Sequence, residues 1–133
     1  MCRIEGSKNV LCSELYRINL SFLYIEGERS CLPTTRLRRQ ASWRPDPIEF
    51  FHYRDRDDFE VDIVLEFGST AVAGVEVKAA ATVVESDFRG LRKLREAAAQ
   101  RFRSGVVLYD GTASVSFGDG LFALPLRRLW ELR

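Results

Sequence analysis

The sequence predicts an α/β (α+β) fold in which an antiparallel meander, a crossover helix and a parallel strand build one mixed β-sheet. Two neighbouring segments, 59–67 and 71–79, alternate apolar and polar residues, as half-buried β-strands do. Apolar residues then recur at helical spacing over 88–102, and a short apolar segment follows at 105–109. A strand, a helix and a second strand in this order imply a right-handed crossover and parallel pairing of the two strands.

The two alternating segments predict a β-hairpin with a defined register. Every odd position in both segments is apolar, so we expect all the odd side chains to face one core. Pairing partners must then sum to an even number, because a slip of one residue would turn one strand over. A three-residue turn at Gly68-Ser69-Thr70 pairs Phe67 with Ala71.

The even positions of the hairpin carry charged residues that suit chemistry on phosphates. The same register places Asp62 opposite Glu76, with Lys78 two residues further along the same face. Like charges directly opposite each other destabilise a sheet, so Lys78 or a divalent cation is needed to compensate them. Mg²⁺ prefers carboxylate oxygens, and a bound cation would polarise a phosphoryl oxygen or lower the pKa of a bound water. Lys78 could then orient the water or stabilise transition-state charge.

A simpler interpretation is that these charges only solvate the outer face of an amphipathic hairpin. One observation argues against it, because uncharged residues interrupt that face: Val64, Val72 and Gly74. We therefore expect the even face to be covered in part. His52, the single histidine of the chain, is interpreted as a packed side chain of a strand rather than a catalytic residue.

Capping and turn signals predict the remaining elements. Ser86 is expected to cap a helix that begins at Asp87 and buries Phe88 and Phe102 on one face, with Gly105 just beyond its end. The other expected elements are a proline turn at 43–47, a strand at 48–54, a hairpin of 115–117 and 121–124, and a short helix at 127–132.

The composition limits the classes of protein to which this chain can belong. The chain has 133 residues, enough for one domain, and its 46% hydrophobic and 29% charged residues are ordinary for a globular protein. No apolar segment approaches the roughly 20 residues of a membrane span. Three cysteines without a CxxC motif argue against a disulfide framework and a zinc site, so a reducing, cytoplasmic location is expected.

Charge is unevenly distributed along the chain, although the net charge of +1 neither favours nor excludes a nucleic-acid partner. Acids concentrate over 46–66, whereas bases concentrate over 36–44 and 89–103. Bases beside acidic metal ligands suit a phosphate backbone, and the candidates for such contacts are Arg89, Arg92 and Lys93. The alternative is that these side chains only cover the solvent face of a helix.

The charged hairpin also resembles a known family. Asp62 followed by Glu76-Val77-Lys78 resembles the D…(D/E)-x-K signature of the PD-(D/E)XK nuclease superfamily. More narrowly, the segment 51–66 looks like the C-terminal domain of bacterial and archaeal AAA+-type ATPases, and the order of motifs agrees from about Arg36 to Trp130. The resemblance implies a restriction-endonuclease-like core over 36–133, after a divergent N-terminal segment at 1–35. The ATPase part of those proteins has no counterpart in this sequence.

The resemblance implies a role for each residue of the signature. Asp62 and Glu76 would be ligands of Mg²⁺ or Mn²⁺, with the Val77 carbonyl as a third ligand, and Lys78 would be the catalytic lysine. Nuclease members carry a further acid on their first helix, which here would fall near Ser30, and Pro33 would break a helix at that place.

Two functions are therefore expected for this chain. The first is a metal-dependent endonuclease that hydrolyses phosphodiester bonds of DNA or RNA. The alternative is a catalytically inactive module of the nuclease fold that binds nucleic acid or a partner ATPase. A related expectation is that the chain is a remnant of a longer ATPase gene.

Overall fold

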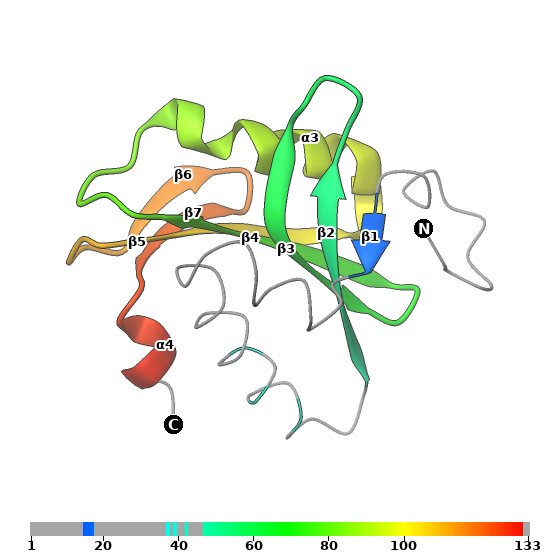
Figure 1. The fold of residues 1–133 in the computed structure, drawn as a ribbon, viewed down its shortest axis with the longest axis horizontal. Helices are drawn as coiled ribbons and strands as arrows, with labels where there is room; N and C mark the ends of the chain where they lie inside the picture. Colours follow the sequence, from blue (N-terminus) through cyan, green and yellow to red (C-terminus); the bar gives the residue numbers. More distant parts are fainter. Residues whose placement is uncertain (1–14, 18–36, 38, 40–41, 43–46, 132–133) are drawn as a thin grey trace.

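The structure, a computed structural model, describes residues 15–17, 37, 39, 42 and 47–131. Within these residues the strands form a single mixed sheet in the order β1-β2-β3-β4-β5-β7-β6 (Figure 1). In chain order the strands are β1 (Leu15–Arg17), β2 (Ile48–Arg54), β3 (Glu60–Phe67), β4 (Ala71–Lys78), β5 (Phe102–Tyr109), β6 (Val115–Gly118) and β7 (Leu121–Pro125).

The topology confirms the expected meander, crossover and parallel strand. Strands β1 to β4 pair antiparallel in sequence order, β4 pairs parallel with β5, and β5 pairs parallel with β7. The predicted second hairpin is also present, with β6 antiparallel to β7. The helical elements are the 3₁₀ turn η2 (Glu85–Phe88), α3 (Arg89–Ala98), the 3₁₀ turn η3 (Ala99–Arg101) and the short α4 (Arg128–Glu131).

The hairpin of β3 and β4 has the register that the turn predicts. Phe67 pairs with Ala71, and the ladder continues in step to Ile63 and Val75. Gly68 begins the turn at φ 59, in the left-handed region that glycine adopts without steric cost. Turn chemistry therefore sets the strand pairing here, as expected.

Both faces of the sheet are covered, which confirms the expectation for the even face. Figure 1 shows α3 across one face and α4 beyond the other. The α3 face buries even residues of the hairpin, Val64 and Val72, against Leu91 and Leu94 of the helix. The opposite face buries odd residues of the hairpin with Leu129 of α4: Ile63, Leu65, Val75 and Val77.

A β-bulge contradicts the expectation that all odd positions of the hairpin share one face. Phe51 pairs with Val64 but Tyr53 pairs with Val61, so two residues of β3, Asp62 and Ile63, lie opposite His52. An extra residue in one strand reverses the side-chain alternation beyond it. Val61, an odd position, is therefore buried in the core beneath α3 and not with Ile63.

The crossover helix starts later and ends earlier than predicted. Ser86 is exposed and forms no capping hydrogen bond, whereas the Asp87 carboxylate accepts a hydrogen bond from the Val84 amide at 2.7 Å. The α-helix ends at Ala98, and Phe102 already belongs to β5. Gly105 does not terminate the helix but lies buried within β5, where a Cβ atom would come within 2.8 Å of the Leu121 side chain.

Some predictions fall on residues outside the described ranges. This group contains the position near Ser30, Pro33, Arg36, most of the proline turn at 43–47, and the segment 1–35 apart from β1. In the described part of the chain, no helix is long and apolar enough to cross a membrane.

Candidate functional site

The bulge in β3 determines where the side chain of Asp62 points. The ladder between β3 and β4 ends at Ile63 and Val75, so Asp62 and Glu76 do not form the expected cross-strand pair. The Asp62 carboxylate instead accepts a hydrogen bond from the backbone amide of Val77, with Oδ2 at 2.9 Å from the nitrogen. A backbone amide needs an acceptor once its strand ladder ends, and Asp62 supplies it. The carboxylate is thereby held against β4, next to Glu76.

Glu76 projects from β4 toward the start of α3. Its side chain is half-buried, and a Cβ atom built on Gly90 would lie 3.0 Å from Glu76 Oε1. Burial raises the pKa of Glu76 to about 8, and the negative charges of Asp62, Glu60 and Asp87 raise it as well. A carboxyl with such a pKa favours either a proton or a nearby cation.

Asp62 is also partly buried, and Glu60 is one of its charged neighbours. Burial raises the pKa of Asp62 above its ordinary value, although the hydrogen bond from Val77 and the proximity of His52 both lower it. Among the described residues, no Lys or Arg side chain forms an ion pair with Asp62 or Glu76. Lys78, one of the two compensations that the sequence leaves open, therefore forms no ion pair with either carboxylate.

Lys78 pairs with a residue that the sequence interpretation did not select. Its Nζ donates a hydrogen bond to Asp87 Oδ2 at 2.5 Å, and both side chains are mostly buried. Burial alone would raise the pKa of Asp87, but the hydrogen bonds from Lys78 and Val84 and the charge of Lys78 bring it below its ordinary value. Asp87 was assigned only to the start of a helix, and its nine-residue separation from Lys78 gives no local signal of contact.

The donor atoms that meet here suit a hard cation in kind but are few in number. Asp62 and Glu76 provide two carboxylates, and Mg²⁺ commonly takes one or two protein carboxylates together with waters and phosphate oxygens. In residues 47–131 and the few described before them, no group of three or more His, Cys, Asp or Glu side chains could hold a metal ion. The described residues therefore offer two carboxylates to a cation and no cage of protein side chains alone.

The candidate phosphate-binding bases lie on α3, and most of them already contact acids. Arg92 pairs with Glu85, and Lys93 approaches Glu96 at 3.5 Å and the Phe59 ring at 5.6 Å from its centroid. Arg89 is exposed and has no acidic partner among the described residues. Two further bases that the charge distribution grouped with them are held elsewhere, since Arg95 pairs with Asp119 and Arg101 with the buried Glu66.

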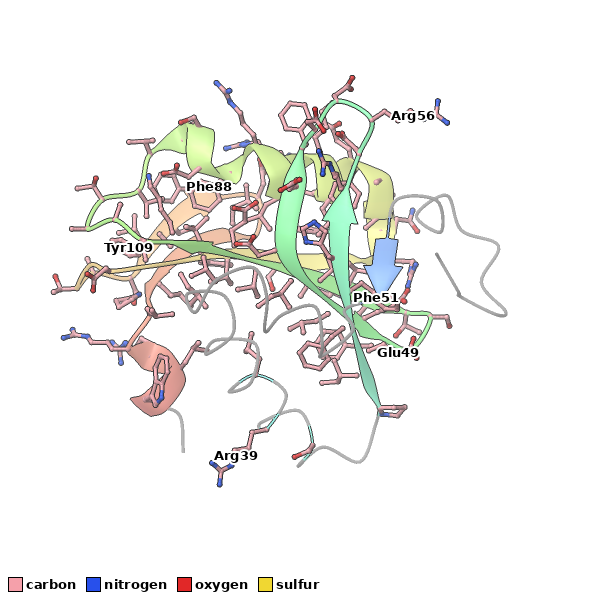
Figure 2. All side chains as sticks on the ribbon, viewed as in Figure 1. Arg39, Glu49, Phe51, Arg56, Phe88 and Tyr109 are labelled. Carbon is pink, nitrogen blue, oxygen red and sulfur yellow. The ribbon has the colours of Figure 1, made fainter. Side chains whose placement is uncertain are left out.

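Two further ionisable side chains, His52 and Arg56, lie on β2 and in the turn that follows it. Figure 2 shows Arg56 at the tip of the turn, pointing away from the sheet. His52 is half-buried on β2, and its Nδ1 lies 3.4 Å from the Asp62 carbonyl oxygen. The expected packed role of His52 fits this position, since the ring lies opposite the bulge.

Fold and site together define a mixed α/β domain that brings two carboxylates and an ion-paired lysine together at one end of β4. The chain matches the family described as Domain of unknown function (DUF4143) over residues 34–129. Because this match covers most of the chain, the protein belongs to that family. No curated protein and no solved structure matches it.

Proposed function

We propose that the domain is a nuclease-like module whose site, Asp62, Glu76 and Lys78, binds Mg²⁺ or Mn²⁺ and hydrolyses phosphodiester bonds of nucleic acid. One observation carries the proposal: the bulge in β3 turns Asp62 onto the Val77 amide, beside Glu76, and no Lys or Arg of the described residues forms an ion pair with either carboxylate. Two carboxylates held together in partial burial are electrostatically unfavourable unless a cation or a proton joins them.

A divalent cation would compensate this arrangement best at neutral pH. Asp62, Glu76 and the Val77 carbonyl would hold it, and it would supply Lewis acidity toward a phosphoryl oxygen and a bound water. Asp62, Glu76 and Lys78 match the D…(D/E)-x-K signature of the PD-(D/E)XK nucleases, in which Val77 takes the variable position. The order of a meander, a crossover helix and a parallel strand agrees with a restriction-endonuclease-like fold, which we infer for this domain.

Asp62, Lys78 and Arg89 would each have a separate role in binding the nucleic acid or stabilising charge. Asp62 is fixed by a backbone hydrogen bond, so its second oxygen is available in a defined direction. Lys78 brings a positive charge to the end of β4, where it can stabilise negative charge that develops on the phosphoryl group. Arg89, on the exposed start of α3, is the base best placed among the described residues to attract a phosphate backbone.

The test combines metal binding with cleavage. Titration with Mn²⁺ alone should give binding to the wild type and none to Glu76→Gln, and the wild type should cleave single- or double-stranded oligonucleotides only with Mg²⁺ or Mn²⁺. Glu96→Gln, which removes an exposed carboxylate of α3, is the matched control and should behave as wild type. Cleavage that survives Glu76→Gln, or a wild type that neither binds metal nor cleaves DNA or RNA, would refute the proposal.

The ion pair between Lys78 and Asp87 favours a second function. Because Asp87 already neutralises this lysine, the domain can be stable as a non-catalytic module that binds nucleic acid or a partner ATPase. This alternative predicts that nucleic acid binds equally well with EDTA and with Mg²⁺, and that Glu76→Gln leaves binding unchanged. A mobility-shift titration of the wild type and Glu76→Gln separates the two functions. If nucleic acid binds only in the presence of metal, the second function is excluded.

A further inference from the structure

The junction of η2 and α3, defined here as Asp87–Gly90, contacts the sheet at two of the proposed site residues. Asp87 Oδ2 accepts a hydrogen bond from Lys78 Nζ at 2.5 Å and another from the Val84 amide at 2.7 Å. Three residues further, Gly90 packs so closely that a Cβ atom there would lie 2.0 Å from the Glu60 carbonyl oxygen and 3.0 Å from Glu76 Oε1. The junction thus touches both Lys78 and Glu76.

We propose that Asp87 is a positioning residue, which holds the amine of Lys78 in a fixed direction at the end of β4, and that Gly90 allows the junction to approach closely enough for this contact. The inference deepens the proposed function and rests on it, because the direction of Lys78 matters to a reaction only if the site reacts. Asp87 is not assigned any contact with substrate or metal.

The geometry of Asp87 explains why this ion pair fixes a side chain that is otherwise flexible. The Val84 amide anchors the same carboxylate oxygen that receives Lys78, so the acceptor itself cannot move freely. Lys78 and Asp87 are only 30% and 20% exposed, which protects their hydrogen bond from water. Ordering a long lysine side chain before the reaction removes an entropic cost from the reacting step.

A second lysine of α3 provides the contrast. Lys93 approaches Glu96 at 3.5 Å, and these side chains are 40% and 66% exposed. Exposed pairs of this kind hold their partners weakly. The pairs Lys78–Asp87 and Lys93–Glu96 therefore offer a matched comparison within one chain, and the chain has only three lysines.

The first measurement follows the position of Lys78 without any assay of activity. Wild type, Asp87→Asn and Glu96→Gln are treated with a limiting amount of acetic anhydride, and the acylation of Lys78 and Lys93 is compared by mass spectrometry. Asparagine keeps an oxygen acceptor for the Val84 amide but loses the charge, so Asp87→Asn should raise the acylation of Lys78 about fivefold or more. Glu96→Gln should leave Lys78 unchanged. Asp87→Ser gives the same comparison if the asparagine variant does not fold.

The second measurement follows the consequence for the reaction. With Mn²⁺ and a cleavable oligonucleotide, Asp87→Asn should lower kcat about 10- to 100-fold at an unchanged KM, since misdirection of a reacting group acts on the chemical step. A loss of fold alone would reduce the amount of active protein, which circular dichroism reports separately. A purely structural ion pair would also raise Lys78 acylation when broken, but it would leave kcat of the folded variant unchanged.

The outcomes separate the two inferences. If Lys78 acylation does not change in folded Asp87→Asn, or kcat stays at the wild-type value, the positioning role of Asp87 is overturned. If the wild type shows neither metal binding nor cleavage, the proposed function fails and the catalytic role of Asp87 fails with it. The acylation ratio then still decides whether Asp87 holds Lys78.

Discussion

Replacement of Glu76 by glutamine should stabilise the protein at neutral and alkaline pH. Glutamine has the same shape as glutamate but cannot ionise, so the change removes only a charge that burial and three neighbouring acids disfavour. The usual expectation for substitution of a half-buried residue is destabilisation. The sign of the effect therefore tests the electrostatics of the site directly.

The pH dependence follows from the raised pKa of Glu76. Below its ordinary pKa of 4.5 the carboxyl is protonated in the folded and the unfolded chain, and its contribution to stability is fully present. As the pH rises toward 8, the unfolded chain releases this proton while the folded chain keeps it, so the wild type loses stability. Glu76→Gln lacks this loss, and the gap between the two proteins should widen from pH 4.5 to pH 8 and then level off.

The magnitude has an upper bound set by the pKa values. A pKa raised from 4.5 to about 8 corresponds to at most about 5 kcal/mol, at about 1.4 kcal/mol for each factor of ten. Glu76 is only partly buried, so water reduces this cost, and we expect about 2 kcal/mol at pH 8. That is a large fraction of the 5–15 kcal/mol (roughly) that stabilises an ordinary domain.

Urea unfolding followed by circular dichroism between pH 4 and pH 9, with EDTA present, provides the measurement. Glu96→Gln is the matched control for the loss of one carboxylate from the surface. Parallel stability curves for wild type and Glu76→Gln, or a glutamine variant that is less stable at pH 8, would refute the electrostatic interpretation. With Mn²⁺ in place of EDTA at pH 8, the urea midpoint of the wild type should rise and that of Glu76→Gln should not, which tests the cation by the same measurement.

The remaining predictions concern the packing that supports the site. Gly90→Ala should destabilise the domain by about 3 kcal/mol, because the new Cβ meets the Glu60 backbone, although helix propensity alone predicts a gain of about 1 kcal/mol. Gly74→Ala, whose Cβ meets side chains and not backbone, should cost about 1 kcal/mol, and equal costs in urea unfolding would contradict the close approach at Gly90. Arg101→Ala should cost about 3–5 kcal/mol, because it leaves the buried Glu66 without its partner. The control Arg95→Ala breaks a more exposed pair with Asp119 and should cost less than about 1 kcal/mol, so similar unfolding midpoints for the two variants would refute this ranking.

Local patterns in the sequence predicted much of the sheet. Alternation over 59–67 and 71–79, together with the Gly68 turn, defined the β3–β4 register, because turn length and the period of a strand are both local properties. The strand at 48–54 was predicted at its observed bounds, and the final hairpin nearly so. Interruption of the even face by Val64 and Val72 correctly indicated that this face is covered.

The sequence predictions were wrong where contacts between distant segments override the local preference for a secondary structure. Helical spacing of apolar residues continued to Phe102, but pairing of Phe102 with Val72 places it in β5. Ser86 has the residue type of an N-cap, yet it is Asp87 that accepts a hydrogen bond from the Val84 amide. The same Asp87 carboxylate also accepts a hydrogen bond from Lys78 of β4. The bulge at Asp62 leaves no mark in the alternation, since Val61 is apolar and is buried on whichever face it meets.

The sequence by itself determined which residues are the candidates for the proposed chemistry, because Asp62, Glu76 and Lys78 lie on two strands joined by a short turn whose register follows from local pattern. The tertiary structure alone decided what these residues touch. Packing of α3 on the sheet brings Gly90 to Glu76 and Asp87 to Lys78, and the bulge against β2 turns Asp62 onto the Val77 amide. Such contacts depend on the close packing of segments remote in the chain, and the pattern of a single strand does not contain them.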